Sequence, residues 1–205
     1  TGTILPVSEI LRLRIALRED ILLVIDGAYA EYLDSDFNLS ILGIVHQFPN
    51  VIMTRTFSKI HSLASLRVGW ALGAERLIGI LERLRSPFNI NGPAVEAAAA
   101  SMQDVKHIQN AKIHNDTCLS KVTSGLRRLG LEVLGSSGNF VLPKFWSESG
   151  RTAVDADQHL QKAGIIVRRV ENYGLPMHLR ISIGTNEQME RVLDTLGNFL
   201  GVDCA

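Results

Sequence analysis

A lysine that directly follows an apolar run is the residue best suited to chemistry in this sequence. Lys59 ends the segment Thr-Arg-Thr-Phe-Ser-Lys at residues 54–59, and the apolar run occupies residues 51–54. A lysine held in a poorly hydrated pocket loses its proton more readily and can then act as a nucleophile or a base. The segment alone allows a second interpretation, in which Lys59 is an ordinary lysine in a surface loop.

Two kinds of neighbour predict an anion near this lysine. Arg67 lies eight residues further on, at the start of the next predicted strand, so it can return to the same edge of the sheet. Its fixed fork of donors suits a phosphate group, and Thr56 and Ser58 add hydroxyl donors for the same anion. Together these residues predict a phosphate site beside Lys59.

An aspartate at the end of an earlier apolar run completes the group. Asp26 follows residues 22–25, at the carboxyl edge where α/β sheets bind ligands, and Tyr29 comes three residues later. A carboxylate buried there needs a cationic partner, because unpaired burial costs several kcal/mol. One cofactor, pyridoxal 5'-phosphate, would use an amine for its aldehyde and a carboxylate for its pyridinium nitrogen. Its ring oxygen would take a tyrosine hydroxyl and its phosphate a cation, so the residue types predict this cofactor.

Alternating strands and helices position these residues in the first half of the chain. Apolar runs predict strands at residues 22–25, 51–54 and 66–72, and helical periodicity covers residues 74–84. Short apolar runs of this kind are typical of strands buried on both faces, in an α/β fold with a mostly parallel sheet. Turn residues at 87–93 then predict a domain boundary.

The second half of the chain has an α+β pattern. An alanine-rich helical region is expected at residues 94–129. The remaining elements are predicted as strands at residues 140–142, 165–167 and 178–183 and as helices at residues 153–162 and 187–200. We therefore predict two domains, residues 1–90 and residues 91–205.

Composition excludes several other classes of protein. Of the 205 residues, 46% are hydrophobic and 20% are charged, which indicates a globular chain. The 21 basic residues balance the 21 acidic ones, which argues against nucleic acid or an anionic membrane as a partner. Cys118 and Cys204 are far apart and the histidines share no spacing, so no disulfide scaffold or metal site is expected. This cysteine usage favours a reducing compartment, and we expect a cytoplasmic location.

The motifs together resemble fold type I pyridoxal phosphate-dependent aminotransferases, and within them most closely the histidinol-phosphate aminotransferase branch. Asp26-x-x-Tyr29, Thr56-x-Ser58-Lys59 and Arg67 carry the resemblance. The similar stretches lie at residues 24–32, 54–59, 66–70 and 179–185. The resemblance spans nearly the whole chain. It implies that residues 1–90 belong to a cofactor-binding large domain and residues 91–205 to a linking helix and a small domain.

The resemblance also implies a role for each residue of the cofactor site. Lys59 would bind the cofactor aldehyde and shuttle the proton, Asp26 would pair with the pyridinium nitrogen, and Tyr29 would hydrogen-bond the ring oxygen. The phosphate would be held by three residues, namely Thr56, Ser58 and Arg67.

Two arginines would bind the substrate. Arg180 lies where the family binds the anionic group of its substrate, and Arg168 matches a second anion-binding arginine of the histidinol-phosphate branch. For each the alternative is a surface charge. The implied reaction is amino transfer between histidinol phosphate and 2-oxoglutarate, as in histidine biosynthesis, by a homodimer. The alternatives are an aromatic amino acid aminotransferase, a decarboxylase of a phosphorylated amino acid, and a non-catalytic cofactor-binding regulatory module.

The sequence departs from the family at several positions. Many relatives have Glu where this chain has Gly27, and glycine where it has Ser62 and Ser65. A serine at a position that needs a positive φ costs about 1 kcal/mol. His61 is expected to be an ordinary loop histidine, with stacking or hydrogen bonding as the alternative.

The resemblance finally concerns length, because family members are about twice as long as this chain. Thr1-Gly2 looks like the end of the family's Asn-Pro-Thr-Gly motif. The chain would then be the carboxyl-terminal half of such an enzyme, and we expect that it does not turn over substrate on its own.

Overall fold

The computed structural model describes residues 1–202, which form two compact units. The first, here called the Lys59 unit, is Leu5–Lys112. The second, the Arg180 unit, joins Thr1–Ile4 to the residues from Ile113 onward. The units therefore divide inside a long helix, whereas the boundary predicted at residues 90 and 91 lies within the Lys59 unit. Cys204 lies outside the described residues.

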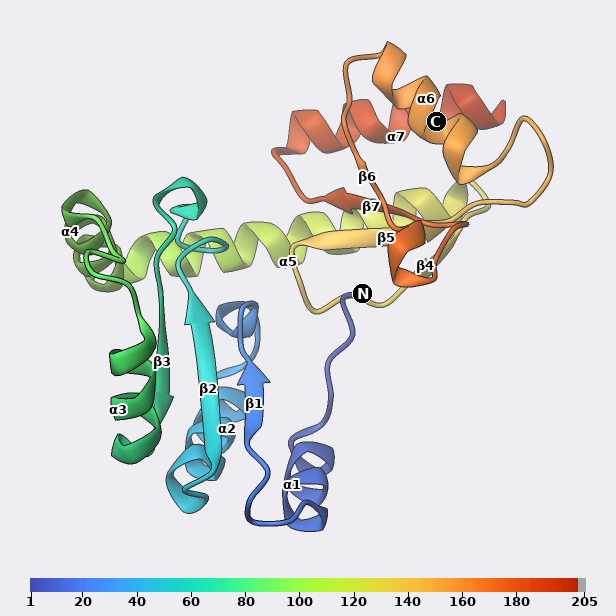
Figure 1. Ribbon diagram of the computed structural model, residues 1–205. Helices are drawn as coiled ribbons and strands as arrows, with labels where there is room; N and C mark the ends of the chain where they lie inside the picture. The colour runs from blue at the N-terminus through green and yellow to red at the C-terminus, as the bar shows by residue number, and fades with distance from the viewer. Residues whose placement is uncertain (203–205) are drawn as a thin grey trace. The chain divides into compact units, whose positions relative to one another are not determined.

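The Lys59 unit contains a three-stranded sheet in the order β1-β2-β3 (Figure 1). Its elements are α1 (Val7–Ala16), β1 (Leu23–Asp26), η1 (Ala30–Tyr32), α2 (Ser35–Gln47), β2 (Val51–Thr56), η2 (Ala64–Leu66), β3 (Gly69–Gly73), α3 (Glu75–Leu84) and α4 (Gly92–Gln103). Strand β1 is parallel to β2, as expected, but β3 is antiparallel to β2, so the sheet of the described chain is mixed.

One face of this sheet is covered by α1 and α2. Ile41, Ile44 and Val45 of α2 are buried against Val51 and Met53 of β2, and apolar residues of α1 pack around them. The first half of β2 is buried on both faces, as its apolar sequence predicts. The prediction is wrong for β1 within the described residues, where it is the edge strand of the sheet and alternates between half-buried and exposed residues.

Two boundaries differ from the sequence prediction for local reasons. The strand expected from Leu66 begins only at Gly69, because a 3-10 turn precedes it and Arg67 has a left-handed backbone with φ 56°. The single helix expected at residues 94–129 is two helices, α4 and α5 (Val105–Arg128). Asp104 separates them, and its carboxylate accepts a hydrogen bond from the His107 N–H at 2.9 Å, as at a helix N-cap.

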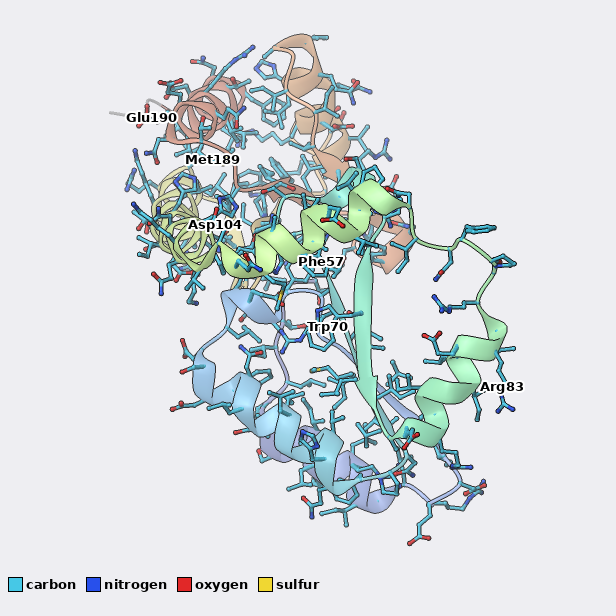
Figure 2. The ribbon with its side chains drawn as sticks, turned by 90° about the vertical axis from the view of Figure 1, so that its left-hand side faces the viewer. Phe57, Trp70, Arg83, Asp104, Met189 and Glu190 are labelled. Carbon is cyan, nitrogen blue, oxygen red and sulfur yellow. The ribbon has the colours of Figure 1, made fainter. Side chains whose placement is uncertain are left out.

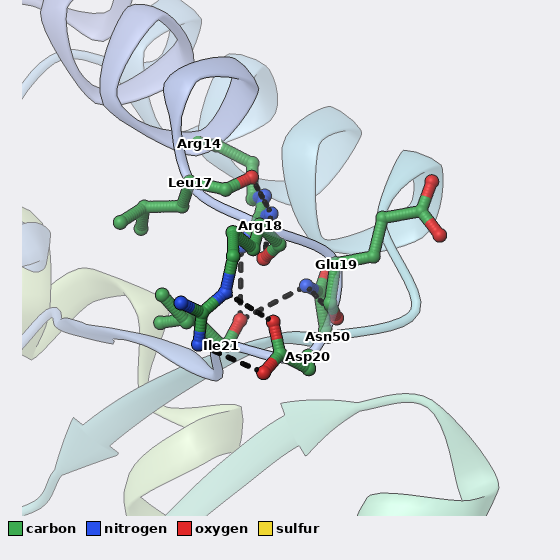
Figure 3. Close-up of polar contacts among 7 residues, drawn as sticks. All are labelled: Arg14, Leu17, Arg18, Glu19, Asp20, Ile21 and Asn50. Atoms are coloured by element: carbon green, nitrogen blue, oxygen red, sulfur yellow. Dashed lines mark hydrogen bonds and ion pairs between the residues drawn. The ribbon is translucent and has the colours of Figure 1, made fainter.

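A buried arginine fixes the connection between α1 and β1. Arg14 is 3% exposed, and its guanidinium donates to the carbonyls of Leu17, Arg18 and Ile21 (Figure 3). The Asn50 side chain also donates to the Ile21 carbonyl, at 2.9 Å. These bonds supply donors to carbonyls that would otherwise be unsatisfied beyond the helix end.

The Arg180 unit contains a four-stranded antiparallel sheet in the order β4-β5-β7-β6. Its elements after α5 are β4 (Glu132–Leu134), β5 (Phe140–Lys144), α6 (Ala153–Lys162), β6 (Arg168–Arg169), η3 (Glu171–Tyr173), β7 (Leu179–Ser182) and α7 (Asn186–Leu200). The strand predicted at residues 165–167 is therefore displaced to β6. Helices α5, α6 and α7 form a hydrophobic core with this sheet. Its buried residues include Val122, Val141, Leu160, Ile181 and Leu196.

None of the helices within residues 1–202 is both long enough and apolar enough to cross a membrane.

Candidate functional site

The structure brings Lys59 and Tyr29 together at one edge of the sheet of the Lys59 unit. The two residues lie in the loops that follow β2 and β1, and the carboxyl ends of these parallel strands meet at the same edge. The Lys59 Nζ lies 5.1 Å from the centroid of the Tyr29 ring. A cation at that distance is attracted by the ring face, so the Tyr29 ring holds the amine at the edge.

Asp26 is the last residue of β1 and lies at the same edge. It pairs with Thr54 in the register of β1 and β2, and its carboxylate accepts a hydrogen bond from the Ala28 N–H at 3.0 Å. Asp26 is exposed in this chain, so the burial considered for its carboxylate is not found in the described residues. The carboxylate is therefore open to a partner that approaches this edge.

Thr56, Ser58 and Arg67 lie at the same edge. The Thr56 hydroxyl accepts a hydrogen bond from the Ser58 N–H at 3.1 Å. Because β3 runs antiparallel to β2, with Gly69 opposite Thr56, the segment before β3 returns to the end of β2. Arg67 lies in that segment, is exposed, and donates from Nη1 to the Ala64 carbonyl at 2.6 Å. The ends of the three strands span two strand spacings, roughly 10 Å.

The loop after Lys59 contains a strained serine. Ser62 has φ 60°, in the left-handed region where a residue with a side chain costs about 1 kcal/mol or more. Ser65 has no positive φ in the structure. Of the two serines, only Ser62 therefore has a backbone conformation that favours glycine.

His61 is not an ordinary loop residue, so that expectation is wrong. It is buried, its Nδ1 lies 2.7 Å from the Ser101 hydroxyl of α4, and its ring centroid is 4.8 Å from that of Phe57. Phe57 in turn packs against Ala94 and Ala98 of α4 (Figure 2). These contacts fix the segment on both sides of Lys59 to α4.

Protonation of two buried histidines is expected to destabilise the protein in mild acid. Burial lowers the pKa of His61 from its ordinary 6.5, with a smaller opposing effect from Glu31, and burial also lowers the pKa of His178. Because the pKa of each histidine is lower in the folded state, the unfolded state binds these protons more readily. The contribution of the neutral histidines to the free energy of unfolding is therefore complete above pH 6.5 and is lost as the pH falls through the folded-state pKa. We expect the free energy of unfolding in urea to fall as the pH is lowered from about pH 6.5, above the range where carboxylates titrate.

His61→Gln should make this fall shallower, because glutamine keeps a polar group beside Ser101 but does not titrate. His46→Gln, at an exposed position of α2, is the matched control and should leave the slope unchanged. An equally steep fall in wild type and His61→Gln would contradict the assignment to His61.

Sequence reasoning missed a polar network beneath the Tyr29 loop. Arg55 of β2 is buried, forms an ion pair with Glu31 at 3.2 Å and donates to the Asn38 side chain at 2.7 Å. The signal in the sequence is a charged residue inside a strand that is otherwise buried, because such a charge needs partners. Its partners are 24 and 17 residues away along the chain, and no local pattern identifies them.

In the Arg180 unit, Arg168 and Arg180 are directly opposite each other on β6 and β7. Residues paired across antiparallel strands share one face of the sheet. The Arg180 guanidinium lies 5.1 Å from the Phe140 ring centroid, and the Arg168 guanidinium lies 5.4 Å from that of Tyr173. The Nε of Arg180 is buried and has no hydrogen-bond partner among the described residues.

This pairing has a chemical consequence. Two like charges directly opposite each other destabilise a sheet, and stacking on a ring uses the face of a guanidinium but leaves its in-plane donors available. A shared anion would relieve the repulsion and satisfy the buried Nε. The pair is therefore suited to an oxyanion with several acceptors, such as a phosphate.

An α/β fold with a lysine, an aspartate and a tyrosine at the carboxyl edge of neighbouring strands is the arrangement of fold type I aminotransferases, and solved structures of that class align with this chain. A putative histidinol-phosphate aminotransferase from Erwinia carotovora aligns with TM-score 0.87 at 33% identity, over 97% of this chain and 56% of that one. Histidinol-phosphate aminotransferase from Sinorhizobium meliloti, solved in complex with pyridoxal-5'-phosphate, aligns with TM-score 0.89 at 26% identity, over 98% and 54%.

The sequence comparison identifies the family. The family model described as aminotransferase class I and II matches residues 1–196, and the chain belongs to that family. Histidinol-phosphate aminotransferase from Rhodospirillum rubrum is 45% identical over 200 residues, which are 98% of this chain and 54% of that protein. The enzyme of the same name from Rhodopseudomonas palustris (strain BisB18) is 42% identical over 98% of this chain and 55% of that protein. The chain spans about half the length of these relatives.

Proposed function

We propose that the protein carrying this chain is a pyridoxal phosphate-dependent aminotransferase that acts on histidinol phosphate, with 2-oxoglutarate as the amino acceptor. The observation that carries the proposal is the Lys59 amine held 5.1 Å from the Tyr29 ring, at the sheet edge where Asp26 also ends its strand. Support for the substrate comes from relatives at 42% and 45% identity that bear the name histidinol-phosphate aminotransferase.

The residues at the sheet edge fit this cofactor by the chemistry of their donors. Asp26 supplies a carboxylate for a pyridinium nitrogen, and Tyr29 a hydroxyl for a ring oxygen. A phosphate would be bound by the Arg67 guanidinium and by the hydroxyls of Thr56 and Ser58. When bound, pyridoxal phosphate supplies an aldehyde that condenses with amines and a ring that accepts electrons from the substrate carbon.

Lys59 would have two roles in this reaction. Its amine would hold the cofactor through the aldehyde, and once free it could accept a proton from the substrate carbon as a positioned base. The Tyr29 ring and the packing of Phe57 on α4 hold the loop around the amine, so that it returns to one position.

The opposed pair Arg168 and Arg180 would bind the phosphate of the substrate. Two guanidinium groups match a phosphate dianion in charge, whereas one matches a carboxylate. We also propose that the protein acts as a homodimer in the cytoplasm, as the family resemblance implies.

A substrate panel tests the proposal. The complete protein, loaded with pyridoxal phosphate, is assayed with histidinol phosphate, phenylalanine and threonine phosphate as separate substrates. We expect the highest kcat/KM for histidinol phosphate, with glutamate formed from 2-oxoglutarate. Preference for phenylalanine would indicate an aromatic aminotransferase, and release of carbon dioxide from threonine phosphate a decarboxylase. No turnover, with the cofactor bound, would favour a regulatory module.

A further inference from the structure

We infer that Arg55 is a positioning residue that acts through Asn38 and Glu31 to hold Tyr29 beside the Lys59 amine. The inference rests on the proposed function, because the position of Tyr29 matters only where its hydroxyl binds the cofactor ring. Arg55 itself lies beneath the loop and is not placed in the cofactor site.

The network begins at the Arg55 guanidinium, a group that only donates hydrogen bonds. The Nη2 of Arg55 donates to the Asn38 Oδ1 at 2.7 Å, and the Nδ2 of Asn38 donates to the Ala30 carbonyl at 2.9 Å and the Asp34 carbonyl at 3.1 Å. A guanidinium can only donate, so it determines which end of the Asn38 amide faces it. The amide is thereby oriented with its NH2 toward the backbone that follows Tyr29.

A second arm reaches the same loop directly. The Nη1 of Arg55 lies 3.2 Å from the Glu31 Oε1, and the two side chains are only 7% and 19% exposed. Glu31 is two residues after Tyr29, in the 3-10 turn η1. Arg55 therefore contacts Glu31 directly and Ala30 through Asn38, both in a short turn whose N-cap is Tyr29 and which has no side-chain cap of its own.

Gly27 provides the room for this arrangement. A Cβ at position 27 would lie 2.9 Å from the Thr54 carbonyl oxygen, 3.0 Å from the Arg55 Cδ and 3.0 Å from its Nε. The Arg55 side chain therefore crosses the backbone where only glycine leaves space. Gly27 and the buried arginine therefore form one structural unit.

The remaining contacts place Tyr29 between two fixed points. The Gly27 N–H donates to the Thr54 carbonyl at 2.9 Å, and the Ala30 N–H donates to the Gly27 carbonyl at 3.0 Å. The Ala30 carbonyl accepts two hydrogen bonds, one from the Leu33 N–H at 3.0 Å and one from the Asn38 Nδ2 of the Arg55 network at 2.9 Å. The ring of Tyr29 thus extends from a backbone that is bonded on both sides, and its position beside Lys59 depends on those bonds.

The test compares Arg55→Lys with a matched control. Lysine keeps the charge but cannot bond Glu31 and Asn38 together through one planar fork. Arg14→Lys is the control, because Arg14 is also a buried arginine of the Lys59 unit with several hydrogen bonds, but it contacts the α1–β1 connection instead. Asn38→Ala is a milder variant that leaves the Arg55–Glu31 pair in place.

The first readout needs no cofactor. Hydrogen exchange is measured in the cofactor-free complete protein at the amides of Ala30, Tyr32 and Leu33, which are hydrogen-bonded within the turn. We expect exchange about tenfold faster in Arg55→Lys, within the range found for coupled neighbours, and unchanged in Arg14→Lys. Equal exchange at these amides in wild type, Arg55→Lys and Asn38→Ala would overturn the inference.

The second readout is a double-mutant cycle with Tyr29→Phe, in which the dissociation constant of pyridoxal phosphate is measured by absorbance. In a protein that keeps Tyr29, Arg55→Lys should weaken the binding of pyridoxal phosphate about tenfold. In the Tyr29→Phe background, the same substitution should weaken it less than about twofold. Equal losses in both backgrounds would show that Arg55 acts only on stability and would overturn the inference. If wild type binds no pyridoxal phosphate, the proposed function fails, and hydrogen exchange alone decides whether Arg55 holds the turn.

Discussion

Replacement of Lys59 by alanine is expected to abolish transamination, with a loss of at least about 10⁴-fold in kcat. The substitution removes the amine that would bind the cofactor aldehyde and that would act as the base for the substrate proton. The measurement is single-turnover kinetics of the complete protein, together with the visible absorbance that pyridoxal phosphate acquires when its aldehyde condenses with a lysine.

Two further variants make this result specific. Lys59→Arg keeps a cation beside the Tyr29 ring but cannot condense with an aldehyde, so it should lose the absorbance as completely as alanine does. Lys106→Ala, on an exposed face of α5, should retain both the absorbance and the activity. A Lys59→Ala protein that kept the band and turned over substrate would rule out the assignment of Lys59.

Loss of Arg168 or Arg180 is expected to give the second largest effect. Each guanidinium would contribute charge-assisted hydrogen bonds to the substrate phosphate, worth about 1.5–3 kcal/mol, or roughly ten- to hundredfold in kcat/KM. Arg168→Gln should raise KM for histidinol phosphate in this range while a substrate without phosphate is little affected. Without substrate, Arg168→Gln should change the free energy of unfolding by less than about 1 kcal/mol, because the lost contact with the Tyr173 ring is offset by the removed repulsion with Arg180.

Arg169→Gln is the matched control for this prediction. Arg169 is the next residue of β6, is exposed, and forms an ion pair with Glu171 at 2.7 Å. Neighbouring residues of a strand point to opposite faces, so its loss should leave KM for histidinol phosphate unchanged. Equal increases in KM for Arg168→Gln and Arg169→Gln would indicate a general effect of charge, and the assignment of Arg168 to the phosphate would be wrong.

The residues at the sheet edge could be predicted because each follows or precedes its own strand within a few residues. Asp26 and Lys59 are placed by short segments whose apolar sequence predicts a strand, and the register of β1 and β2 then aligns their ends. The return of Arg67 to this edge is expected from the sequence as well, and the structure adds that β3 runs antiparallel to β2. The roles of these residues stay predictions.

Other features were beyond local patterns because distant residues determine them. Helix α2 contains Gly43, and glycine weakens a helix by about 1 kcal/mol relative to alanine. The helix is stabilised instead by the burial of Ile41 and Ile44 against the sheet. His61 looks like a loop residue until Ser101 of α4 is placed beside it.

The left-handed backbone at Ser62 has a consequence for how this protein could adapt to heat. A glycine there would relieve a conformational penalty without disturbing any neighbour, so selection for thermal tolerance should favour it among the first changes. The same exchange at Ser65 offers no such relief and would only loosen the unfolded chain. Ser62 is therefore a position where a single exchange can raise stability, whereas the exchange at Ser65 is expected to be neutral or harmful.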